Sequence, residues 1–152
     1  MSMMRCVTAL LLLAGFAQEH QRGAMVMGFD QEKTAHHFRL YTDGGAIEVG
    51  VRDAADTKDR DAIRSHLPHI AMMFKDGNFD APMLVHNSTN VPGTKVMASR
   101  KDVIQYQYRH TATGGSVLIT TSDPEALDAV HDFLRYQIAE HETGDPTVPT
   151  KR

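Results

Sequence analysis

Two glycine pairs, each standing between runs of alternating apolar and polar residues, constrain the fold of this chain most strongly. Alternating runs on either side of a glycine-containing turn are typical of a β-hairpin. The sequence therefore predicts two hairpins. The first joins residues 36–41 and 46–52 through Asp43-Gly44-Gly45, and the second joins residues 104–110 and 116–121 through Thr113-Gly114-Gly115.

A helical pattern follows each hairpin. Residues 53–59 form a polar entry to a predicted helix over residues 60–76, which Gly77 ends. The segment Ser122-Asp123-Pro124-Glu125 combines a capping residue, a first-turn proline and acidic residues, so it predicts a second helix that runs to about His141. The repeated order predicts an α+β fold: a duplicated ββα unit, with a mainly antiparallel sheet and two helices on one face.

This order also sets the domain boundaries. We expect one domain over residues 35–146, in which halves 35–76 and 103–142 are joined by a functional loop, 77–102, and followed by a tail, 147–152. A short strand is predicted at Met83–His86 within that loop. The inward positions of the sheet are predicted to be Phe38, Leu40, Ile47, Val49, Val51, Tyr106, Tyr108, Val117 and Ile119.

The N-terminus has the order of a secretory signal peptide. Arg5 precedes an apolar run that ends at Phe16, and small residues stand before a polar stretch. We therefore expect a signal peptide over residues 1–17, cleavage near Ala17, a periplasmic or extracellular location, and a flexible or loosely docked arm over residues 18–34. A buried N-terminal helix is the alternative. Cleavage would remove Cys6, the only cysteine of the chain.

Composition excludes several function classes. The formal net charge is −3 and basic residues form no long block, so we expect no nucleic-acid partner. No apolar run reaches the roughly 18–20 residues of a membrane span. The chain also lacks a G-x-S-x-G elbow, a P-loop, an H-E-x-x-H motif and a C-x-x-C-H motif.

Histidine and methionine are plentiful, with nine of each, and they are densest between residues 66 and 86. On a helix, His66, His69 and Met73 share one stripe, at spacings that let neighbouring side chains meet one ligand. Pro68 is expected to kink or restart that helix. Met83 and His86 are expected to fold back over the same face, and strand parity makes His36 a further candidate.

Imidazole and thioether groups together point to a particular class of metal. Imidazole binds copper, zinc, iron and nickel, whereas thioether sulfur favours Cu(I). The sequence therefore predicts an exported metal-binding protein that stores, senses or delivers copper, with zinc or haem as alternatives. The predicted metal-ligand set is His66, His69, Met73, Met83, His86 and His36.

Other interpretations of these residues stay open. Methionines beside Phe74 often only fill a core, and His131 and His141 are expected to be structural or pH-sensitive. The same histidines would also serve a small enzyme, or a haem or small-molecule binder, through a pocket between the helices and the loop. A metal-free homodimer that acts as an interaction domain is the third interpretation.

Residues 36–146 resemble a family of small exported bacterial proteins without an established activity. The resemblance rests on residues 36–38 (HHF), 43–45 (DGG), 64–74 (RSHLPHIAMMF), Pro82-Met83 with His86, and 143–146 (TGDP). Similar sequences sometimes carry a transcarbamylase name. That activity needs a Ser-x-Arg-Thr type loop for carbamoyl phosphate, which this chain lacks. The resemblance therefore implies domain boundaries and an important helix–loop segment, but no mechanism.

Overall fold

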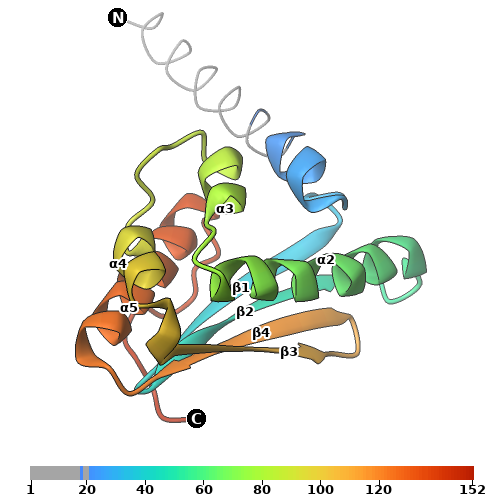
Figure 1. Ribbon diagram of the computed structural model, residues 1–152. Helices are drawn as coiled ribbons and strands as arrows, with labels where there is room; N and C mark the ends of the chain where they lie inside the picture. The colour runs from blue at the N-terminus through green and yellow to red at the C-terminus, as the bar shows by residue number, and fades with distance from the viewer. Residues whose placement is uncertain (1–17, 19–20) are drawn as a thin grey trace, which may run out of the picture.

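A four-stranded antiparallel sheet forms one layer of the molecule, with strand order β1-β2-β4-β3 (Figure 1). The computed structural model describes residue 18 and residues 21–152. The strands are β1 (Thr34–Tyr41), β2 (Gly44–Val51), β3 (Ile104–His110) and β4 (Gly114–Thr121). The predicted α+β class, the antiparallel sheet and both hairpins are confirmed.

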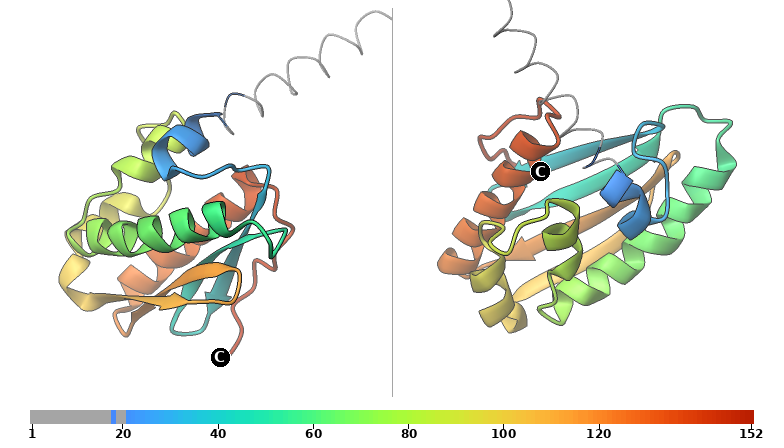
Figure 2. Two further views of the ribbon diagram at one scale, coloured as in Figure 1. Left: turned by 90° about the vertical axis from the view of Figure 1, so that its right-hand side faces the viewer. Right: turned by 90° about the horizontal axis from the view of Figure 1, so that it is seen from above.

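Two long helices cover one face of the sheet, and two short helices lie beside them (Figure 2). The helices are α2 (Thr57–Lys75), α3 (Asp80–Val85), α4 (Thr94–Ser99) and α5 (Pro124–Glu140). Helix α2 packs chiefly on β3 and β4, whereas α5 packs chiefly on β1 and β2. Each long helix thus covers mainly the strands of the other half, an order only loosely consistent with a duplicated ββα unit. None of the helices in the described part of the chain is long and apolar enough to cross a membrane.

Aspartate caps begin both long helices. The Asp123 carboxylate accepts a hydrogen bond from the Ala126 N–H at 2.8 Å, and Asp56 accepts one from the Asp59 N–H at 3.1 Å. The Asp56 cap starts α2 three residues earlier than predicted. The helix does not restart at Pro68, because α2 continues through it. Buried residues next to Pro68, such as Leu67 and Ile70, hold this part of the helix on the sheet.

The core lies between the sheet and the long helices. Every predicted inward position on β1, β2 and β4 is buried, while Tyr106 and Tyr108 on edge strand β3 are half-buried. Phe133 and Leu134 of α5 complete the centre of this core with Leu67 of α2.

The segment before β1 is packed against this core. Residues 21–27 are helical, and Phe29 is only 3% exposed. The Arg22 Nε donates a hydrogen bond to the Val85 carbonyl at 3.2 Å, which ties the helical segment to α3. A buried aromatic side chain thus anchors this segment, which the sequence predicted to be a flexible or loosely docked arm. The predicted signal peptide, residues 1–17, lies outside the described residues.

The connection between the halves is helical rather than extended. The strand predicted at Met83–His86 is wrong, since α3 occupies Asp80–Val85 and His86 ends it. Pro82 lies in the first turn of α3, where its missing N–H leaves no helical bond unmade. Ala81 and Val85 are buried, so the helix packs its apolar side inward.

The C-terminal tail covers the outer edge of β1. Thr150 forms a parallel bridge with Tyr41, and its N–H donates to the Leu40 carbonyl at 3.1 Å. Asp145 adds a further link, because its carboxylate accepts the Phe38 N–H at 3.0 Å. Covered edge strands are protected from pairing with other chains. The C-terminal segment therefore protects the edge of β1 at the positions that it contacts.

Candidate functional site

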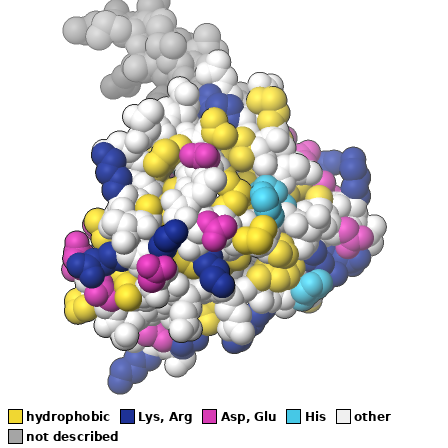
Figure 3. Space-filling view, viewed as in Figure 1, with side chains coloured by type: hydrophobic (Ala, Val, Ile, Leu, Met, Phe, Trp, Pro, Cys, Tyr) yellow, Lys and Arg dark blue, Asp and Glu magenta, His cyan; other side chains and the backbone are white. Residues whose placement is uncertain are grey.

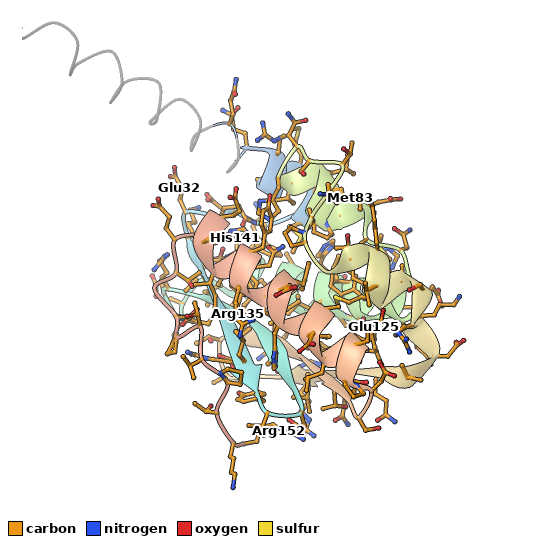
Figure 4. All side chains as sticks on the ribbon, turned by 90° about the vertical axis from the view of Figure 1, so that its left-hand side faces the viewer. Glu32, Met83, Glu125, Arg135, His141 and Arg152 are labelled. Carbon is orange, nitrogen blue, oxygen red and sulfur yellow. The ribbon has the colours of Figure 1, made fainter. Side chains whose placement is uncertain are left out.

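The six predicted metal ligands do not meet at one point. His66, His69 and Met73 lie on α2, whereas His36 lies on β1 and His86 ends α3, and both of these line one cavity. Met83 lies on α3, and Figure 4 shows it on a different element from His141. Across residues 18 and 21–152, no three His, Cys, Asp or Glu side chains gather so that they could hold a metal ion.

The α2 group keeps the predicted stripe, because the helix is continuous. The His66 and His69 rings have centroids 6.5 Å apart. The His66 Nε2 is buried and has no hydrogen-bond partner. Burial, and secondarily the charge of His69, lowers the pKa of His66 below its ordinary value. This imidazole is therefore neutral near pH 7 and keeps a lone pair for a ligand. Met73 is partly buried against the core.

Phe29 contacts histidines of both groups. Its ring centroid is 6.1 Å from that of His36 and 6.3 Å from that of His66. Figure 3 shows hydrophobic and histidine side chains adjoining on this face, above α2 and between α3 and the helical segment of residues 21–27. The Phe29 ring thus packs against histidines of both groups, in the region where the sequence predicted a single metal site.

His141, at the end of α5, joins His36 and His86. Its ring stacks on His36 with centroids 5.3 Å apart, and it meets His86 edge-on at 5.0 Å. Phe38 packs against the same ring at 5.4 Å. The sequence left His141 as structural or pH-sensitive, but it is the member of this cluster that contacts both of the others. Below, "histidine cluster" means His36, His86 and His141.

Gln137 supports the cluster from α5. Its Oε1 lies 3.0 Å from the His86 Nε2, and the His86 side chain is only 1% exposed. Glu140 lies farther away, with its Oε2 4.0 Å from the His86 Nδ1. The Gln137 Nε2 is buried and without a hydrogen-bond partner. Sequence reasoning missed Gln137, although a glutamine directly before buried Ile138 in an apolar helix face was a detectable signal.

Two hollows meet at the histidine cluster. An inner cavity of about 60 Å³ has mainly apolar walls, among them Phe38, Ile47, Leu67, Phe74 and Phe133. An outer recess of about 620 Å³ opens beside it and has polar walls. His36 and His141 line both spaces, together with Gln31 and Val85. The cluster therefore stands where the apolar cavity adjoins the polar recess.

The recess carries charges of both signs. Its walls include Arg52 and three glutamates, Glu32, Glu140 and Glu142. Figure 4 shows Glu32 near His141 at the end of α5. The Arg52 Nε donates to the Glu32 carbonyl at 3.3 Å, which links the segment before β1 to the end of β2. The recess can therefore receive a polar group that both donates and accepts hydrogen bonds.

His131 has a different role from the cluster. It is 7% exposed, and its Nε2 lies 2.8 Å from the Tyr41 carbonyl and 3.0 Å from the Gly44 carbonyl. A protonated Nε2 donates to both oxygens and so ties α5 to the β1–β2 turn. These contacts are those of a structural histidine.

Searches of protein-family models, curated proteins and solved structures find no match to this chain. The resemblance to exported bacterial proteins therefore stays a prediction. Inferences about function rest on the geometry of the site.

Proposed function

We propose that this protein binds a small organic molecule with an apolar part and a polar part. One observation carries the proposal: an apolar cavity and a polar recess meet at the His36 and His141 rings, and His86 lines the cavity beside them. Concave sites with apolar walls and a few convergent polar groups are the usual form of small-molecule sites. The sequence-based alternative of a histidine-lined binding pocket is thus kept, with His36, His86 and His141 as its histidines.

The volumes of the inner cavity and the outer recess constrain the size of each part of the ligand. At roughly 10–15 Å³ for each water-sized group, an inner cavity of about 60 Å³ takes about four to six non-hydrogen atoms. The outer recess of about 620 Å³ takes a larger polar portion. We therefore expect a ligand with a small apolar end and a polar remainder.

Imidazoles at the junction contribute hydrogen bonding to such a ligand. A neutral imidazole has one donor and one acceptor nitrogen, so it pairs with hydroxyl, carbonyl or carboxylate groups. Imidazole side chains can also act as general acids or bases in catalysis. Binding is the function proposed here, and proton transfer to a bound molecule is the reaction these residues would support.

Fragment binding tests the proposal directly. Fragments with a small apolar ring and a polar substituent are titrated into ¹⁵N-labelled protein, and we expect chemical-shift changes around His36, His86 and His141. His141→Ala should weaken binding, whereas His110→Ala, at an exposed position at the end of β3, should not. Shift changes that avoid the pocket, or equal binding by both variants, would contradict the proposal.

Copper is a second candidate, favoured by one separate observation. The buried and unpartnered His66 Nε2 belongs to a neutral imidazole, next to His69 and on the same stripe as Met73. Cu(I) accepts imidazole and thioether ligands. Structural zinc usually takes four ligands, so this smaller set favours copper over zinc.

Metal analysis of untagged protein tests the copper proposal. After incubation with Cu(I) and desalting, we expect about one retained copper per chain by mass spectrometry. His66→Gln combined with His69→Gln should abolish retention, while the exposed control His110→Gln should keep it. Equal copper content in the double variant and the control would contradict a site on α2.

A further inference from the structure

The amide of Gln137 is unusual among the polar groups of the inner cavity. Gln137 is 4% exposed and lines this cavity, yet its Nε2 has no hydrogen-bond partner. Buried polar groups are nearly always paired, so an unpaired donor beside an apolar cavity needs an explanation. A ligand that supplies the missing acceptor provides one.

We propose that the Gln137 amide recognises a carbonyl oxygen on the apolar end of the ligand. This inference rests on the proposed binding function and specifies which chemical class enters the inner cavity. Ketones, aldehydes, esters and amides of small apolar groups belong to that class. Hydrocarbons of the same shape fill the volume but leave the donor unpaired.

His86 fixes the direction in which the amide presents its donor. The His86 Nε2–H donates to the Gln137 Oε1 at 3.0 Å, which leaves the Nε2 hydrogens for another acceptor. His86 is held in turn, because its ring packs edge-on against Tyr136 at 5.2 Å and His141 at 5.0 Å. The amide is therefore oriented before any ligand arrives, as a selective site requires.

Most of the cavity wall around the Gln137 amide is apolar. Phe38, Leu67 and Phe133 are buried and carry no hydrogen-bonding side-chain atoms. A carbonyl oxygen among them meets a hydrogen-bond donor at Gln137, so its loss of hydration is compensated there. The hydrogen bond between the ligand carbonyl and the Gln137 amide therefore favours the ketone over the hydrocarbon of the same shape.

Cyclopentanone and cyclopentane are matched probes for this test. Both fit the expected four to six non-hydrogen atoms, and only the ketone has an acceptor. In ¹⁵N-labelled wild-type protein, we expect cyclopentanone to bind roughly tenfold more tightly, the factor that about 1.4 kcal/mol gives. We also expect it to shift the Gln137 side-chain amide resonances, and cyclopentane to leave them nearly unchanged.

Substitution separates recognition from simple filling of the cavity. Gln137→Met keeps a similar size and removes the donor, so the preference for cyclopentanone should disappear. Gln105→Met, at an exposed position on β3, is the matched control and should keep it. The wild-type amide shift gives an independent answer even if Gln137→Met does not fold.

The possible results distinguish this inference from the function on which it rests. Equal binding of both probes in the pocket overturns carbonyl recognition and leaves the binding function standing. Absence of both probes from the pocket overturns both proposals. A ketone preference that survives in Gln137→Met also overturns the assignment of the donor to Gln137.

Discussion

Replacement of Asp145 by alanine should lower the free energy of unfolding, because the substitution removes three hydrogen bonds to the Asp145 carboxylate. The Asp145 side chain is 6% exposed, and its carboxylate accepts hydrogen bonds from the Phe38 N–H, the His37 ring and the Arg39 guanidinium, each at 3.0 Å. All three donors lie on edge strand β1. This one carboxylate therefore holds the C-terminal segment against the sheet.

The three contacts contribute different amounts to the free energy of unfolding. A hydrogen bond from a buried N–H to a carboxylate contributes about 1.5–3 kcal/mol, and Phe38 is buried. The side chains of His37 and Arg39 are 44% and 36% exposed, so water replaces the carboxylate and each contact contributes about 0.5 kcal/mol or less. Asp145→Ala should therefore lower the free energy of unfolding by about 2–4 kcal/mol. Asp145→Asn, which keeps an acceptor for Phe38, should cost less.

Urea unfolding at pH 7 measures this loss. With a slope of about 2 kcal/mol per molar urea, a loss of about 3 kcal/mol lowers the midpoint by about 1.5 M. Asp128→Ala, at an exposed position on α5, is the control and should change stability by about 0.5 kcal/mol or less. Equal midpoints for Asp145→Ala and Asp128→Ala would refute the reasoning.

The effect of Asp145 should also depend on pH with a definite sign. Burial raises the pKa of Asp145, but hydrogen bonds from Thr143, Phe38 and His37 outweigh it and hold the pKa below its ordinary value. A lowered pKa in the folded state stabilises the protein above the unfolded pKa, and the effect is lost as pH falls through the folded pKa. The gap between wild type and Asp145→Asn should thus be constant from about pH 5 to 8 and shrink below about pH 4.

Three further predictions concern stability and association. Gly93→Ala should cost more than about 1 kcal/mol by thermal unfolding, because φ is +80° and the new Cβ would lie 2.1 Å from the Ala129 carbonyl oxygen; an unchanged melting temperature would contradict this close approach. Because the lowered pKa of His66 keeps it neutral when folded, wild type should lose stability relative to His66→Gln as pH falls below about 6.5, and parallel stability–pH curves would contradict that account. Deletion of residues 148–152 removes the Thr150 pairing with β1, so light scattering should show faster association than for full-length protein, and equal rates would contradict edge protection.

Local patterns in the sequence determined the elements of the fold. Alternation around the two Gly-Gly turns predicted both hairpins, and Asp123-Pro124 predicted the start of α5 within a residue. These features depend on neighbours in the chain: turn chemistry, side-chain parity and capping. The error at Met83–His86 came from the same local rules, because the buried side of α3 decided that segment instead.

The candidate site depended on contacts that no local pattern contains. His36, His86, Gln137 and His141 come from three separate elements, and only packing of α3 and α5 near the start of β1 brings them together. The sequence by itself determined the two hairpins, the two long helices and which residue types are available for chemistry. The tertiary structure alone decided which histidines meet, because packing of α3 and α5 brings His86 and His141 to His36, while the buried Phe29 ring contacts His36 and His66.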